Sequence, residues 1–64
     1  MIHLHPFEQR AYRALKRLVF IYRSHQPLSQ RHLEYFYFLG GEHSLCRETV
    51  SELLREAIPD GLPA

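Results

Sequence analysis

The fold is decided by residues 28–41, which read Leu-Ser-Gln-Arg-His-Leu-Glu-Tyr-Phe-Tyr-Phe-Leu-Gly-Gly. Ser29 is a good N-cap residue and predicts that a helix starts here. Residues 35–39 also suit a strand, because aromatic side chains favour sheets. No other segment offers a second strand to pair with this run. We therefore predict a helix over residues 29–39 that ends at the Gly40-Gly41 pair in a left-handed conformation.

Apolar residues recur three and four positions apart on both sides of this segment, which indicates two more amphipathic helices. The first is predicted over residues 6–24, where Pro6 suits the first helical position. The other is predicted over residues 46–57, with Ser44 as its N-cap or, if the start shifts by two residues, Cys46. Residues 59–64 are expected to form a loosely held end. The expected fold class is an all-α three-helix bundle.

Composition is consistent with one domain made of all 64 residues, of which 45% are hydrophobic. Cys46 is the only cysteine, so a disulfide within the chain is excluded and a reducing, cytoplasmic location is expected. The N-terminus lacks the apolar stretch of a signal peptide. The apolar runs are too short to cross a bilayer, so no membrane association is expected.

The net charge of +1 hides a strong asymmetry along the chain. Residues 1–31 carry a charge of +5, whereas residues 32–64 carry −4. Such a distribution suggests that a basic face meets something acidic. The acidic partner is a nucleic acid, another protein, or the acidic half of a second copy.

Two segments carry a resemblance to a known family. Residues 28–33 read Leu-Ser-Gln-Arg-His-Leu, and residues 46–56 read Cys-Arg-Glu-Thr-Val-Ser-Glu-Leu-Leu-Arg-Glu. They resemble the two helices of the helix-turn-helix in bacterial transcription factors, most of all the cyclic-AMP receptor protein family. The core of that family's recognition helix reads Arg-Glu-Thr-Val. The resemblance covers residues 28–58 and implies a module that binds double-stranded DNA.

The resemblance also implies roles for single residues of the third helix. Arg47 would address guanine O6 and N7, and Glu48 would accept a hydrogen bond from cytosine. Val50 would pack inward and hold the helix to the core. Thr49 and Ser51 would meet phosphates, and Ser51 is also expected to read bases together with Arg47 and Glu48.

Two features depart from that family's pattern. Glu52 stands where the family has a second arginine. The separation of Leu33 and Val50 exceeds that of the compact motif, so we expect a lengthened turn in which residues 40–44 form a loop.

Basic residues on the other two helices complete the expected DNA site. Those on the first helix recur at helical spacing and suit phosphate contacts, although a solvated face that maintains solubility is an equally simple explanation. The predicted nucleic-acid-binding residues are Arg10, Arg13, Lys16, Arg17, Arg31, Arg47, Glu48, Ser51 and Arg55.

The aromatic run makes the second helix apolar around most of its circumference. We expect Tyr35, Phe36, Tyr37 and Phe38 to form a homodimer or partner surface; a wrapped core and base stacking on single strands are the alternatives. This run also supports a second function, that of a small adaptor or inhibitor that binds a larger protein.

Metal binding and catalysis are not expected. His3 with His5, and His43 with Cys46, each offer two potential zinc ligands, but the usual cysteine pairs are missing. The chain has no Gly-rich phosphate loop and is too short to form a typical substrate cleft. We therefore predict no metal, no cofactor and no enzymatic activity.

Overall fold

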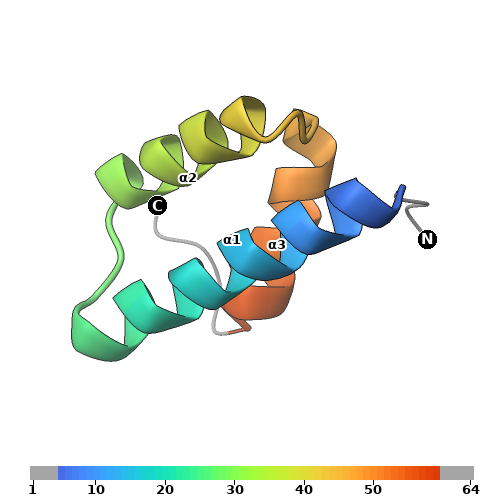
Figure 1. The fold of residues 1–64 in the computed structure, drawn as a ribbon. Coiled ribbons are helices and arrows are strands. Elements are labelled where there is room, and N and C mark those ends of the chain that lie inside the picture. Colours follow the sequence, from blue (N-terminus) through green and yellow to red (C-terminus); the bar gives the residue numbers. More distant parts are fainter. Residues whose placement is uncertain (1–4, 60–64) are drawn as a thin grey trace.

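The computed structural model describes residues 5–59, which form three α-helices and no strand (Figure 1). Helix α1 spans Pro6–His25, α2 spans Gln30–Glu42 and α3 spans Arg47–Ala57. In Figure 1, α2 runs alongside α1, and α3 passes behind α1. The predicted all-α three-helix fold is confirmed. Most of the predicted end segment, residues 60–64, lies outside the described residues.

Helix α1 begins and ends close to the predicted positions. His5 is the N-cap, and its backbone N–H donates to the Glu8 carboxylate at 3.1 Å, while Pro6 occupies the first turn. At the other end, the backbone N–H of Gln26 donates to the Tyr22 carbonyl at 3.2 Å. The helix stops there because the residue before Pro27 disfavours helical geometry.

Helix α2 starts at the predicted N-cap. The backbone N–H of Ser29 donates to Nδ1 of His32 at 2.9 Å, so a histidine takes the place that glutamate usually has in a capping box. The alternative strand over residues 35–39 is excluded, because those residues lie in the middle of the helix.

The predicted end of α2 is wrong, because Gly40 and Gly41 are helical and the helix continues to Glu42. Ser44 supplies the left-handed residue instead, with a φ of 61°. The N–H of Leu45 donates to the Gly40 carbonyl at 2.8 Å, and that of Ser44 donates to the Gly41 carbonyl at 3.0 Å. These two bonds are those of a Schellman motif. The connection to α3 is therefore residues 43–46, and the predicted loop over residues 40–44 does not form.

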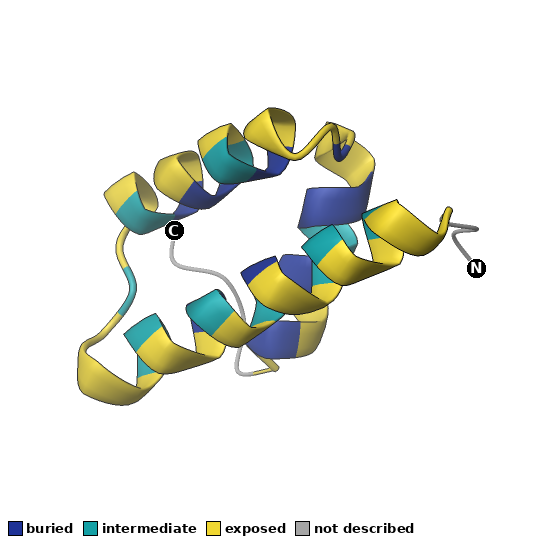
Figure 2. Cartoon of the chain, in the orientation of Figure 1, coloured by how far each residue is buried: buried dark blue, intermediate teal, exposed yellow. Residues whose placement is uncertain are grey.

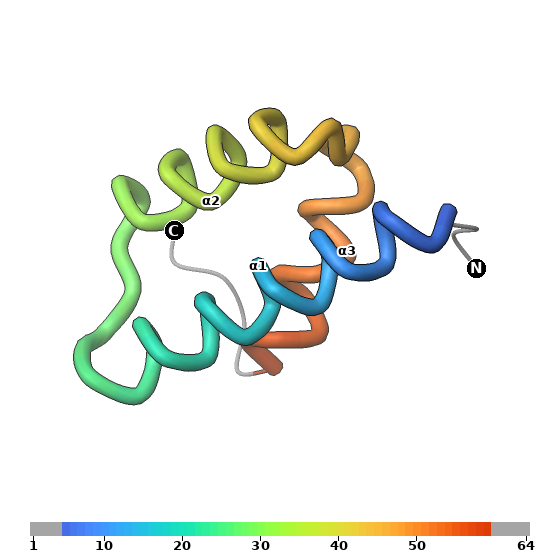
Figure 3. The backbone as a smooth tube through the Cα atoms, viewed as in Figure 1, coloured from blue at the N-terminus to red at the C-terminus, as the bar shows by residue number. Residues whose placement is uncertain are grey.

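Ser44 is consequently not the N-cap of α3. That position belongs to Cys46, the second of the two predicted alternatives, whose thiol lies 3.0 Å from the Thr49 hydroxyl. The smooth tube in Figure 3 shows how tightly the chain turns from α2 into α3 compared with the open connection between α1 and α2.

Gly40 is present because two helices approach closely there, and not because the chain turns. A Cβ atom at this position would lie 2.4 Å from Cγ2 of Val50, well inside van der Waals contact. A Cβ atom at Gly41 would meet nothing within 4 Å. Absence of a side chain at Gly40 thus lets the end of α2 rest directly on α3.

The core lies between the three helices, where their apolar faces meet (Figure 2). Its largest fully buried side chains are Val19 from α1, Phe36 from α2, and three from α3. Those three are Val50, Leu53 and Leu54. The predicted inward position of Val50 is confirmed. No helix within residues 5–59 is long and apolar enough to cross a bilayer.

Candidate nucleic-acid interface

The exposed side of α3 carries most of the residues of this helix that the sequence predicted to contact DNA. Arg47, Glu48 and Arg55 are exposed, and Ser51 is half-buried. Thr49 does not belong with them. It is 2% exposed and pairs with the Cys46 thiol, so the predicted phosphate contact of Thr49 is wrong.

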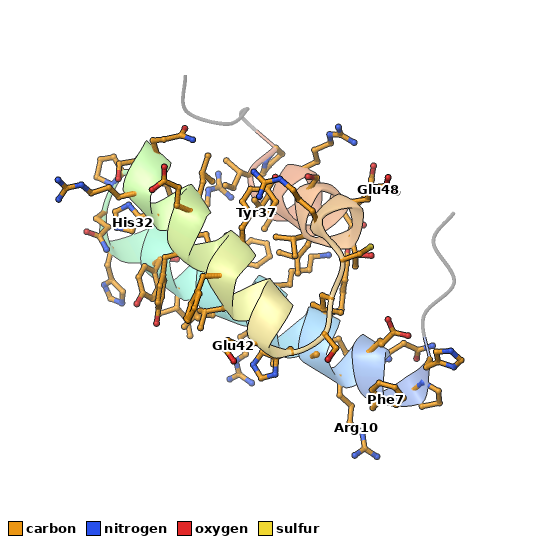
Figure 4. All side chains as sticks on the ribbon, turned by 90° about the horizontal axis from the view of Figure 1, so that it is seen from above. Phe7, Arg10, His32, Tyr37, Glu42 and Glu48 are labelled. Atoms are coloured by element: carbon orange, nitrogen blue, oxygen red, sulfur yellow. The ribbon has the colours of Figure 1, made fainter. Side chains whose placement is uncertain are left out.

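Tyr37 of α2 holds two residues of this face. The Tyr37 and Ser51 hydroxyl oxygens are 2.7 Å apart and hydrogen-bonded. The guanidinium carbon of Arg47 lies 4.0 Å from the centroid of the Tyr37 ring, which is a cation–π contact. The aromatic run gave no indication of this role, because a sequence does not show which side of α2 meets α3. Figure 4 shows Tyr37 between the two helices.

A shallow depression of about 360 Å³ lies beside this contact. It is lined by Tyr37 and Arg47 together with Gln30, Glu34 and Phe38 of α2. The lining combines one cation, one anion, an amide and two aromatic rings. This open, mixed surface suits contact with a larger molecule better than enclosure of a small one.

The charges on the outer side of α3 nearly cancel. Arg55 is paired with Glu52 at 2.6 Å, and both side chains remain largely open to solvent. Glu48 in the first turn interacts favourably with the helix dipole and offsets Arg47. Electrostatic attraction of a polyanion by α3 alone is therefore weak.

Three arginines form a basic stripe on α1. Arg10, Arg13 and Arg17 follow a spacing of three and four residues and are all exposed. Figure 4 shows Arg10 and Glu48 extending from different sides of the molecule. The structure thus places this stripe and the α3 face on separate surfaces. Arg31 is also exposed, and it lies on the remaining helix, α2.

Lys16 does not belong to the basic stripe, which corrects its predicted place on that face. Its ammonium contacts the Glu56 carboxylate of α3 at 2.7 Å. The Tyr12 hydroxyl donates to the same carboxylate at 2.9 Å. These hydrogen bonds from Lys16 and Tyr12 lower the pKa of Glu56. Burial and the neighbouring carboxylate of Glu56 raise the pKa of Tyr12 to about 12.

The predicted aromatic surface is divided by the fold. Phe36 is fully buried, so it is a core residue and its prediction as a surface residue is wrong. Tyr35 and Phe38 are 44% and 60% exposed, whereas Tyr37 is half-buried against α3. On α1, Phe7, Phe20 and Ile21 are also exposed.

Within residues 5–59, no three His, Cys, Asp or Glu side chains are close enough together to hold a metal ion. His3, one of the potential zinc ligands, lies outside this range. Cys46 is exposed, and its hydrogen bond with the Thr49 hydroxyl lowers the pKa of the thiol.

Comparison with known proteins adds no assignment to these residues. No protein-family model matches the chain, and neither a curated protein nor a solved structure is significantly similar to it. Functional inference therefore depends on the chain's own residues.

Proposed function

We propose that this chain binds double-stranded DNA through the exposed face of α3. The observation that carries the proposal is the junction of α2 and α3. The two helices are joined by four residues, 43–46, and rest on each other at Gly40 and Val50. A helix pair joined by a turn of this length is the framework of helix-turn-helix DNA readers. The resemblance of residues 46–56 to a recognition helix points to the same face.

Contacts at the start of α3 support a role for Arg47 in base recognition. Its guanidinium rests on the Tyr37 ring, which limits the conformations that the free side chain adopts. A preorganised arginine loses less conformational entropy when it binds guanine O6 and N7 through two hydrogen bonds. Glu48, one position further and exposed, would accept a hydrogen bond from cytosine N4.

The basic stripe of Arg10, Arg13 and Arg17 would act differently in this proposal. It lies away from α3, so it would raise the local concentration of DNA or contact a neighbouring part of the backbone. Such contacts carry no sequence information and depend on salt.

The test is fluorescence anisotropy of labelled duplexes, with Arg47→Gln and Arg10→Gln as a matched pair of variants. Each substitution removes one exposed arginine charge from a helix. We expect the parent to bind random duplex with a dissociation constant of about 10⁻⁴–10⁻⁶ M and to weaken as salt rises. On a duplex obtained by site selection, Arg47→Gln should reduce the preference over random sequence by about 5- to 150-fold.

Arg10→Gln should instead weaken binding to all duplexes alike. Absence of binding at low salt by a protein that circular dichroism shows to be folded would refute the proposal. Binding with no preference among duplexes, and equal behaviour of the two variants, would exclude α3 as the reading helix.

A second candidate is an adaptor that binds a larger protein. The observation that favours it is the exposure of five large apolar side chains, together with the near-neutral outer face of α3. These side chains are Phe7, Phe20, Ile21, Tyr35 and Phe38. Discrimination between duplexes separates the two candidates, because a protein-binding module has no reason to prefer one base pair.

A further inference from the structure

The outer side of α2 carries a stripe of four exposed residues: Arg31, Tyr35, Phe38 and Glu42. At about 100° per residue, these positions fall within an arc of roughly 60° on the helix surface. Figure 2 shows exposed residues along the side of α2 that faces away from the other two helices. We call this set the α2 stripe.

Neither charge of the α2 stripe is neutralised inside the described part of the chain. No hydrogen bond or ion pair within residues 5–59 involves the side chain of Arg31 or Glu42. Both charges also oppose the helix dipole. Arg31 lies in the first turn, where an anion is favoured, and Glu42 lies in the last, where a cation is favoured.

The α2 stripe has the same spacing whether it is followed from its first residue or from its last. Its four members are separated by four, three and four positions. When the direction is reversed about a point between residues 36 and 37, Tyr35 takes the place of Phe38, and Arg31 takes the place of Glu42. Aromatic then faces aromatic, and cation faces anion. A two-fold interface requires this kind of self-complementary surface.

We propose that two copies of this chain associate through the α2 stripe, with their α2 helices antiparallel about a two-fold axis. Each Arg31 then meets Glu42 of the other copy, and each Tyr35 packs against Phe38 of the other copy. The antiparallel arrangement also places the first turn of one α2 beside the last turn of the other. Each misplaced charge gains an opposite charge and the favourable end of the neighbouring helix dipole.

The interface leaves the exposed residues of α3 uncovered, although Phe38 belongs both to the α2 stripe and to the lining of the depression beside Arg47. Tyr37 and Gly40, which contact α3, lie on the inner flank of α2 and not in the α2 stripe. None of the exposed residues of α3 belongs to the stripe. Self-association needs no residue of α3, so it is measured without DNA.

Charge reversal tests the predicted pairing directly. Arg31→Glu brings two glutamates together at each end of the symmetric pair, and Glu42→Arg brings two arginines together. Measured by sedimentation equilibrium, each variant alone should have a dimer dissociation constant at least ~10-fold above that of the parent. An equimolar mixture of the two variants should associate within about threefold of the parent, because every cross-copy pair is again of opposite charge.

The variants are designed to remain folded, since each places a charge where the helix dipole favours it, and circular dichroism verifies this. Matched controls are Arg10→Glu on α1 and Glu48→Arg on α3. They reverse exposed charges outside the α2 stripe and should associate as the parent does. Three results would each overturn the proposal: a parent that stays monomeric up to about millimolar concentration, single variants as dimeric as the parent, or variants that fail to associate when mixed.

Discussion

The two sides of α2 use the same residue types for opposite purposes. Phe36 is fully buried in the core, whereas Phe38, two positions away, is 60% exposed. Gly40 is packed against Val50, whereas its neighbour Gly41 has open space where a side chain would be. Composition does not distinguish the members of either pair. Their positions around the helix do, because α1 and α3 cover only one side of it.

This difference explains why one short helix contributes to both stability and recognition. The inner side is constrained by packing, where each added or removed carbon changes the fit. The outer side carries the α2 stripe, in which only the Tyr35 ring lies against another helix, 6.3 Å from the Tyr22 ring of α1. Substitutions at matched positions on the two sides should therefore have very different effects.

The largest difference is expected for phenylalanine truncation. Phe36→Ala should lower the free energy of unfolding by about 3–5 kcal/mol, which is comparable to the total stability of a domain this small. Phe38→Ala should change it by no more than about 0.5 kcal/mol. Urea denaturation at low protein concentration, where self-association does not contribute, measures the change for Phe38→Ala and shows whether Phe36→Ala retains an unfolding transition.

Because Phe36→Ala is expected to unfold the chain, Phe36→Leu provides a measurable intermediate, with a loss of about 1–1.5 kcal/mol. Similar losses for the alanine variants at both positions would mean that α2 is not oriented as described.

Replacing the two glycines by alanine should change the free energy of unfolding by smaller amounts and in opposite directions. Gly40→Ala should lower it and Gly41→Ala should raise it. The methyl group of Gly40→Ala meets the short, stiff side chain of Val50, and overpacking of this kind costs about 1–3 kcal/mol. Alanine regains about 1 kcal/mol through its helix propensity, so a net loss of up to about 2 kcal/mol is expected. The methyl group of Gly41→Ala meets no neighbour, so the substitution gains helix propensity at no packing cost. It should raise the free energy of unfolding by about 0.5–1 kcal/mol.

Thermal unfolding of the two alanine variants measures this contrast, since the shifts in Tm should have opposite signs. Equal stabilisation by both substitutions would show that α2 and α3 are not in close contact at Gly40.

The smallest effect is expected where α1 meets α3 through polar side chains, at Tyr12, Lys16 and Glu56. Burial and the Glu56 carboxylate raise the pKa of Tyr12 from 10.0 to about 12. Because the pKa is higher in the folded state, the stabilising contribution is present below pH 10 and is lost as the pH rises through about 12. Absorbance of tyrosinate should show a titration step near pH 12, and Tyr12→Phe should remove that step.

Glu56→Gln separates the effect of the neighbouring carboxylate on the pKa of Tyr12 from the effect of burial. It should lower the pKa of Tyr12 only in part, since burial is the larger cause. At neutral pH it should reduce stability by about 0.2–1 kcal/mol, because the ion pair with Lys16 is half-exposed and screened by solvent. A step near pH 12 that is unchanged in Tyr12→Phe would contradict the assignment to Tyr12.

Local signals in the sequence were sufficient for the helices and most of their ends. The N-cap at Ser29, the proline at position 6 and the apolar spacing act within a few residues of the chain, and the structure confirms the elements they predicted. The end of α2 was mispredicted because a glycine satisfies two different requirements. A left-handed φ and a close helix contact both select glycine, and only the position of Val50 distinguishes them.

The sequence predicted which residues of α3 belong to the candidate site, but it did not predict the residue of α2 that contacts them. Spacing alone indicated that Arg47 and Ser51 lie near the outer side of α3. Their contacts with Tyr37 join residues 10 and 14 positions apart across two helices, which no local pattern records. Lys16 was likewise predicted on the basic stripe, because its partner Glu56 is 40 positions away in the chain.

The sequence by itself determined that this protein has three helices, where the first two begin, and which residue types are available on each. Helix formation depends on caps, propensity and periodicity, all of which act over a few residues. Only the tertiary structure decided which side of α2 is buried, that Gly40 serves a helix contact, and that the basic stripe and the α3 face lie apart. Those outcomes depend on how three amphipathic surfaces fit together, and the fit is set by packing between residues distant in the chain.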